Sequence, residues 1–87
     1  MKESLEAKRK RLLFRSRHRG SRELDILLGR FAATHLARLD ADQLDRYEAV
    51  LANDDPEIFA WVSGREPVPA AFDTDVMRLL KVLNNSA

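Results

Sequence analysis

Apolar side chains recur at helical spacing along most of this chain. The clearest example starts at residue 24, where apolar positions follow the i, i+3, i+4, i+7 rule of a helix with one buried face. The positions that define this stretch are Leu24, Leu27, Leu28, Phe31, His35 and Leu39. No stretch alternates with a period of two over a useful length, so the pattern predicts an all-α fold.

A second helix is predicted to begin after Asp40 and to end near Asn53. Asp40 is a favoured N-cap residue, and Gln43, three residues later, supplies the returning side chain of a capping box. Apolar spacing then marks a buried face formed by Leu44, Tyr47 and Leu51.

A short third helix is predicted with Asp55 as its cap and Pro56 in its first position, where proline loses no needed hydrogen bond. Gly64 is expected to end it. Phe59 and Trp61 are two residues apart, so they cannot both face the core. We expect one of them to be partly exposed or packed beneath residues 17–25, with this helix supporting that segment.

Two more helices are predicted at the ends of the chain. Residues 2–17 contain no Gly or Pro and suit a helix with a narrow apolar stripe. After an extended connection at Pro67 and Pro69, a last helix is predicted to include Phe72, Val76, Leu79, Leu80 and Leu83. The fold class is therefore all-α, a single domain over residues 1–87 built as a bundle of about five helices, with fraying expected at 1–7 and 84–87.

Composition narrows the class of protein. A chain of 87 residues is one small domain, and without cysteine it has no disulfide or thiol-ligated metal. No apolar run approaches the roughly 18–20 residues that span a bilayer. Glu3 and Glu6 interrupt the basic start, whereas transit peptides are poor in acids. We expect no membrane insertion or export, and a location in the cytoplasm of a bacterium or the mitochondrial matrix of a eukaryote.

A net charge of +1 conceals an uneven distribution of charge. Residues 1–22 hold nine Lys or Arg against two Glu, a local charge of +7, whereas residues 23–87 hold six against twelve, a local charge of −6. Such a division suits docking to an acidic partner, either protein or nucleic acid. The run Lys8 to Arg11 fits a solvated helix face as well as it fits a partner-binding surface.

Residues 17–25 join the basic segment to the most regular helix. Gly20 is expected to adopt a positive φ and to end the preceding helix. Ser21 is expected to accept hydrogen bonds from the N–H groups that open the next helix. Arg19 and Arg22 are expected to project from the resulting turn.

The residues of an enzyme site are not found in this sequence. Glu23 and Asp25 lie two apart in a first helical turn, so they compensate the helix dipole and cannot act as an acid and base pair. His18 and His35 have no partner at metal-ligand spacing, and His35 on the apolar face is expected at the edge of the core. The residues alone predict a small helical interaction domain without catalytic, metal or cofactor-binding residues, with a basic nucleic-acid binder as the alternative.

Two motifs carry a resemblance to a known family. Arg19-Gly20-Ser21-Arg22-Glu23 resembles the Arg-Gly-x-x-Glu motif of the succinate dehydrogenase flavinylation factor family, the small FAD assembly factors of bacteria and mitochondria. The run from Asp54 to Trp61 looks like the family's second signature, Asp-Asp-Pro-x-x-Phe-x-Trp. The likeness covers roughly residues 8–83. His18 departs from it, since family members often carry Lys or Arg there, and the segment after Gly64 is the least similar part.

The resemblance implies a five-helix assembly factor, or chaperone, that binds the flavoprotein subunit of succinate dehydrogenase. It would promote covalent attachment of FAD to a histidine of that client, so FAD would belong to the client and the factor would have no cofactor and no catalytic residue of its own. Fumarate reductase is a further candidate client. We expect a monomer with no nucleic-acid partner.

The resemblance also assigns residues to the client surface. The set expected to bind the partner comprises Arg17, His18, Arg19, Gly20, Arg22, Glu23 and Asp25. A supporting set is expected in the second signature: Asp54, Asp55, Phe59 and Trp61. Purely structural roles stay open for three of these residues, because Gly20 can serve only as a helix terminator, Glu23 only as a dipole partner and Asp55 only as a cap.

Two other functions make different predictions. A nucleic-acid-binding domain using residues 8–22 would lose affinity steeply with salt, and loss of Glu23 would not weaken its binding. A structural adaptor would bind its partner without affecting flavin attachment.

Overall fold

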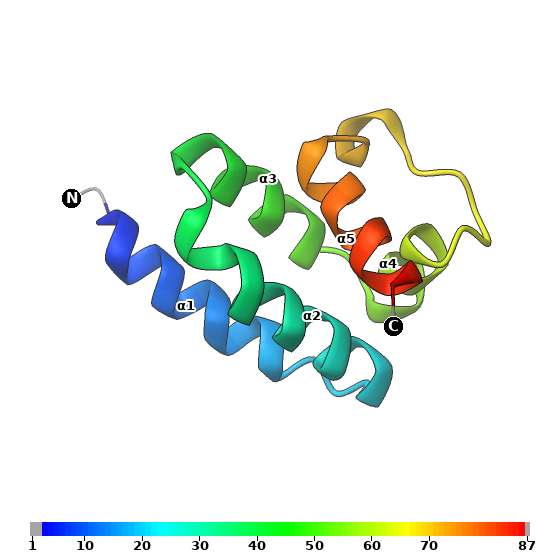
Figure 1. Cartoon of the computed structure of the whole chain (residues 1–87), viewed down its shortest axis with the longest axis horizontal. Coiled ribbons are helices and arrows are strands. Elements are labelled where there is room, and N and C mark those ends of the chain that lie inside the picture. Colours follow the sequence, from blue (N-terminus) through cyan, green and yellow to red (C-terminus); the bar gives the residue numbers. More distant parts are fainter. Residues whose placement is uncertain (1–2, 87) are drawn as a thin grey trace.

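The computed structural model describes residues 3–86, which fold into five α-helices and two short 3₁₀ turns (Figure 1). No strand occurs in this part of the chain, so the predicted all-α bundle of about five helices is confirmed. None of the described helices is both long and apolar enough to cross a membrane. In chain order the elements are α1 (Leu5–Arg17), α2 (Arg22–His35), η1 (Leu36–Arg38), α3 (Ala41–Leu51), α4 (Asp55–Val62), η2 (Ala70–Phe72) and α5 (Asp75–Asn85).

Capping residues set where several helices begin. The Ser4 side chain accepts from the N–H of Ala7 at the start of α1. Before α3, Asp40 accepts from the N–H of Gln43 at 2.8 Å and the Gln43 side chain accepts from the N–H of Asp40 at 3.0 Å, so the predicted capping box is confirmed. Helix α1 therefore starts within the stretch expected to fray, while residues 1, 2 and 87 lie outside the described residues.

Two predicted boundaries of the C-terminal helices are wrong. Asp54, not Asp55, is the N-cap of α4, which places Asp55 in the first turn and leaves its carboxylate free for another contact. Phe72 lies in η2 and not in the last helix, because the Thr74 side chain caps α5 two residues later. Helix α5 ends at Asn85, within the stretch where fraying was expected.

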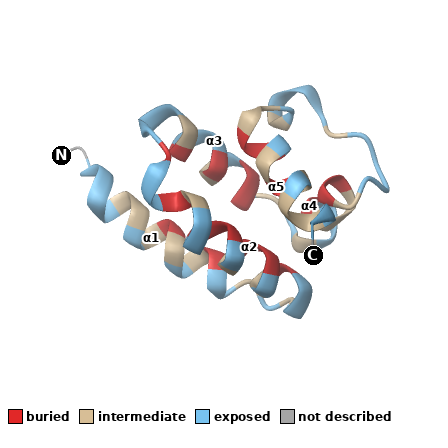
Figure 2. Ribbon diagram, in the orientation of Figure 1, coloured by how far each residue is buried: buried red, intermediate tan, exposed pale blue. Residues whose placement is uncertain are grey.

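One core draws side chains from all five helices (Figure 2). At its centre Tyr47 is fully buried, and its hydroxyl lies 2.6 Å from Oγ of Ser16. Because Ser16 donates to the carbonyl of Leu12, it accepts from Tyr47, and burial raises the pKa of the tyrosine to about 12. His35 is half-buried with its ring 5.0 Å from that of Phe31, which confirms its predicted place at the core edge.

Gly29 lies inside α2, where a glycine can mark the close approach of another backbone. No such approach occurs here, because a Cβ on Gly29 would meet only a side-chain atom, Cγ of Arg17, at an ordinary contact distance of 3.7 Å.

Replacing Gly29 with alanine is therefore expected to raise the free energy of unfolding by about 0.5–1 kcal/mol, through better helix propensity and a less flexible unfolded chain. Urea unfolding followed by circular dichroism measures this change. Gly20→Ala is the matched control and should be destabilising, because Gly20 has a φ of +87°. A loss of stability in Gly29→Ala would contradict the expectation.

Candidate functional site

The loop between α1 and α2, residues 18–21, presents the first motif. Helix α1 ends at Arg17, and Gly20 adopts a φ of +87° before α2 begins at Arg22. No atom lies within 4 Å of where a Cβ on Gly20 would be, so the backbone conformation and not crowding calls for glycine here. The predicted positive φ is confirmed.

Arg19 does not project from this loop, and that prediction is wrong. Its guanidinium turns back onto the junction of α3 and α4, where Nε donates to Oδ1 of Asp55 at 2.9 Å. Nη1 donates to the carbonyl of Leu51 at 2.8 Å and Nη2 to that of Asn53 at 2.9 Å. Only 11% of the Arg19 side chain is exposed. The arginine therefore joins the two motif segments, 36 residues apart in sequence, into one site.

The start of α2 is also held differently from the prediction. Ser21 is its N-cap residue, but its side chain makes no capping hydrogen bond and instead donates to Glu23 at 3.4 Å. Asp25 in the first turn accepts from the backbone N–H of Arg19 at 2.7 Å. A carboxylate that reaches back along the chain therefore fixes the loop where a serine cap was expected.

The outer side of the loop is exposed. Arg17, His18, Gly20, Arg22 and Glu23 are all exposed, and within residues 3–86 no ion pair involves Arg17, Arg22 or Glu23. These side chains are thus available to a partner.

His18 carries an unpredicted contact on this side. Its ring stacks on Phe14 with 3.9 Å between ring centres, and its Nδ1 donates to the carbonyl of Phe14 at 2.7 Å. Phe14 itself is 62% exposed, so an aromatic pair flanks the loop.

A hollow of about 260 Å³ lies beside the motif glutamate. Residues from α2, α4 and α5 line it: Glu23, Ile26, Leu27, Arg30, Phe59 and Asn84. Ile26 is 54% exposed there. Ile26 and Arg30 were not among the predicted site residues, although their spacing of three and seven residues from Glu23 places all three on one helical face.

Helix α4 divides its two aromatic residues as predicted. Phe59 is half-buried and borders the hollow, with the guanidinium carbon of Arg65 5.5 Å from its ring centre. Trp61 is buried and stacks on Phe72, with ring centres 5.2 Å apart. Helix α4 therefore supports the loop through Asp55, whereas Trp61 packs in the core.

Comparison with known proteins identifies the family. Residues 10–84 match the family described as the flavinator of succinate dehydrogenase. The chain belongs to this family. Succinate dehydrogenase assembly factor 2-B, mitochondrial, of Drosophila melanogaster is 43% identical to it over 81 residues, which cover 91% of this chain and 52% of the relative. Assembly factor 2-A, mitochondrial, of Drosophila yakuba is 42% identical over 81 residues, covering 91% of this chain and 50% of the relative. The chain spans about half the length of these relatives.

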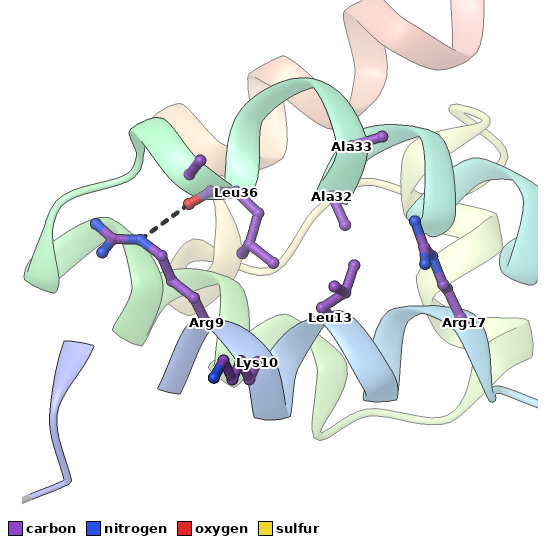
Figure 3. A pocket seen from close by; sticks show the side chains of 8 residues that line it. Arg9, Lys10, Leu13, Arg17, Ala32, Ala33 and Leu36 are labelled. Carbon is purple, nitrogen blue, oxygen red and sulfur yellow. Dashed lines mark hydrogen bonds between the residues drawn. The ribbon is translucent and has the colours of Figure 1, made fainter. Parts of the chain in front are cut away.

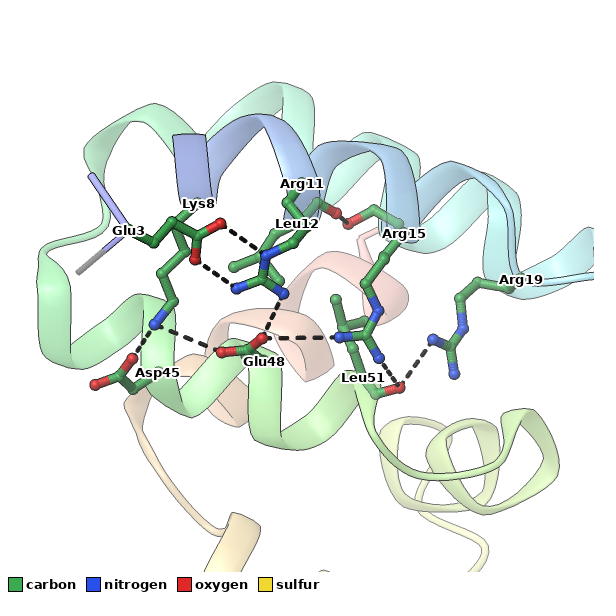
Figure 4. A network of polar contacts seen from close by, with 10 residues as sticks. Glu3, Lys8, Arg11, Leu12, Arg15, Arg19, Asp45, Glu48 and Leu51 are labelled. Atoms are coloured by element: carbon green, nitrogen blue, oxygen red, sulfur yellow. Dashed lines mark hydrogen bonds and ion pairs between the residues drawn. The ribbon is translucent and has the colours of Figure 1, made fainter. Parts of the chain in front are cut away.

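Within this flavinator-family chain, most of the basic run in α1 binds internal partners (Figure 4). Lys8 pairs with Asp45 and Glu48, and Arg11 pairs with Glu3 and Glu48. Arg9 donates to two backbone carbonyls. Among residues 8–11 only Lys10 is exposed. This run is therefore neither a simple solvated face nor a free surface for phosphates, and the nucleic-acid alternative finds no support in it.

The ion pairs of Glu48 predict a pH effect. The hydrogen bond from Arg11 holds the pKa of Glu48 below its usual value near 4.5. A carboxylate whose pKa is lower in the folded than in the unfolded protein stabilises the fold at pH values above its unfolded-state pKa. This stabilisation is lost as the pH falls through the pKa of the carboxylate in the folded protein. Between about pH 6 and pH 3 the melting temperature should therefore fall less steeply in Glu48→Gln than in the wild type.

Melting curves followed by circular dichroism across this pH range test the effect. Glu57→Gln is the control, because Glu57 is exposed and has no ion pair within residues 3–86. Parallel profiles for the wild type and Glu48→Gln would contradict the role assigned to Glu48.

The structure brings some of the predicted site residues together and keeps others apart. The loop residues and Asp55 form one connected unit through Arg19, whereas Asp54 is an exposed cap and Trp61 lies in the core. Within the described residues no three His, Asp or Glu side chains are placed to hold a metal ion. Contact of the motif residues with a client stays a prediction.

Proposed function

We propose that this protein binds the flavoprotein subunit of succinate dehydrogenase and promotes the covalent attachment of FAD to it. Family membership and the names of the relatives as succinate dehydrogenase assembly factors support the proposal. The observation that carries the proposal is the structure of the motif loop, residues 18–21, and of the first turn of α2. The contact between Arg19 and Asp55 fixes this segment from the inside, while Glu23 remains exposed on its outer side.

A loop fixed in this way is preorganised for binding. Its backbone loses little further freedom when a partner docks, so more of the contact energy appears as affinity. Glu23 can pair with a base on the client, and Gly20, with no side chain, allows the client backbone to come close. Arg19 acts as a positioning residue for both.

The reacting groups in this proposal belong to the client. The client supplies the flavin and the histidine, and bond formation requires the two in a near-attack geometry. By binding the client conformation that has this geometry better than other conformations, the factor increases its population. The factor itself then needs no catalytic residue and no cofactor. We propose that it acts where the client is assembled, which for a eukaryote is the mitochondrial matrix; the names of the relatives describe them as mitochondrial.

The test is covalent flavin on the succinate dehydrogenase flavoprotein subunit, read as fluorescence of the denatured protein band. Reactions contain wild-type factor, no factor, Glu23→Ala or Glu57→Ala. Glu57 is the matched control because it is an exposed carboxylate in the first turn of α4, as Glu23 is in α2.

Attachment should require the wild type, persist with Glu57→Ala and fall by more than about tenfold with Glu23→Ala, because losing one partner of a desolvated charge pair costs about 2–5 kcal/mol. Circular dichroism verifies that each variant is folded. Attachment that proceeds equally without the factor would overturn the proposed function.

A further inference from the structure

A second surface feature lies on α1, on a different face from the ion pairs with α3. A groove of about 240 Å³ runs between α1 and the end of α2 with η1 (Figure 3). The side chains that form it are Arg9, Lys10, Leu13, Arg17, Ala32, Ala33, Leu36 and Ala37. Spacings of three and four residues place its α1 members on one stripe of that helix.

Small side chains leave this groove open. The α2 and η1 side contributes Ala32, Ala33 and Ala37, whose side chains end at Cβ, and Leu13 and Leu36 fill only part of the space between the helices. The floor is therefore apolar and concave, with room for one further side chain and not for another helix.

Every charged side chain that lines the groove is a cation. Arg9 is fixed at one end, where Nε donates to the carbonyl of Leu36 at 3.3 Å and Nη2 to that of Leu39 at 2.7 Å. Arg17 lies toward the other end and has no ion pair within residues 3–86. Lys10 approaches Glu6 at 3.8 Å, but both side chains are more than three-quarters exposed, so this pair contributes little.

We propose that this groove binds an acidic segment of the client flavoprotein, with one apolar side chain on the floor and neighbouring carboxylates paired with Lys10 and Arg17. The proposal rests on the proposed function, because it takes the client as the partner. Arg17 directly precedes the motif loop, so the groove extends the client surface from the loop along α1. An apolar floor without an aromatic side chain suits a peptide side chain and offers nucleic-acid bases nothing to stack on.

Binding of the apo flavoprotein subunit to immobilised factor, measured by biolayer interferometry, tests the groove with two matched pairs of variants. Ala33→Glu places a carboxylate on the floor, and Ala49→Glu makes the same change at an exposed position of α3. Lys10→Glu reverses a charge on the rim, and Arg78→Glu does so at an exposed position of α5. Circular dichroism verifies the fold, and Lys10 is exposed enough for its variant to fold if Ala33→Glu does not.

Ala33→Glu and Lys10→Glu should each weaken binding by about tenfold at roughly 50 mM salt, while their controls bind as the wild type does. The effect of Lys10→Glu should shrink at about 500 mM salt through screening. If both groove variants bind the subunit with wild-type affinity while Glu23→Ala binds it more weakly, the proposed role of the groove is overturned and the proposed function stands. Weakening by Ala33→Glu with Lys10→Glu equal to Arg78→Glu would overturn the acidic nature of the segment. A wild-type factor that does not bind the subunit would overturn both proposals.

Discussion

Replacing Arg19 with alanine is expected to lower the free energy of unfolding by about 2–4 kcal/mol and to abolish flavin attachment. The change leaves the carboxylate of Asp55 without its cation and the carbonyl of Asn53 without its donor. The carbonyl of Leu51 loses its shorter hydrogen bond and keeps only that from Arg15 at 3.3 Å. Removing one partner of a largely buried charge pair costs far more than removing a surface charge, because the remaining group stays desolvated. Urea unfolding followed by circular dichroism measures the loss of stability.

Arg22→Ala is the control for this change, since Arg22 is an exposed arginine three residues along the chain. Surface substitutions of this kind usually stay within about 0.5 kcal/mol. A stability loss in Arg19→Ala no larger than that in Arg22→Ala would show that the contacts of Arg19 do not hold the fold.

Asp55→Ala separates two ways in which Arg19 could serve the client. If Arg19 acts by positioning the loop, Asp55→Ala should also reduce flavin attachment, and Arg19→Ala combined with Asp55→Ala should cost less stability than the sum of the single changes. If Arg19 contacts the client directly, Asp55→Ala should leave attachment near the wild-type level. Flavin fluorescence and a double-mutant cycle in urea distinguish these outcomes.

Features that depend on neighbouring residues could be predicted from the sequence. The capping box of Asp40 and Gln43 and the positive φ of Gly20 each depend on a few consecutive residues, so local chemistry was sufficient. The helical period after residue 24 likewise predicted buried faces correctly, because period and burial are directly linked.

Features that depend on distant contacts could not be predicted in this way. The sequence places Arg19 next to a turn, where solvent was the simplest expectation, but its partners at 51, 53 and 55 come close only when α3 and α4 pack. The same holds for the hollow beside Glu23, which needs Phe59 from α4 and Asn84 from α5. The Asp55 cap was misplaced by one residue, since two consecutive aspartates offer two equivalent N-cap candidates.

Trp61→Ala is expected to lower the free energy of unfolding by about 3–5 kcal/mol, as much as Arg19→Ala or more, yet to leave the loop at residues 18–21 in place. Trp61 is only 6% exposed and stacks on Phe72, so its removal opens a cavity in the core. The hydrogen bonds that hold the loop go to Leu51, Asn53 and Asp55, none of which the change removes.

At a temperature where the variant is still folded, amide chemical shifts of residues 18–25 should stay close to wild type and flavin attachment should be retained. Arg19→Ala should show the reverse, with altered shifts and no attachment at comparable or smaller cost in stability. Displaced loop shifts in folded Trp61→Ala would mean that the tryptophan supports the loop from beneath after all. The contrast between the two variants thus tests whether the loop owes its geometry to the Arg19–Asp55 contact or to the packing of α4 as a whole.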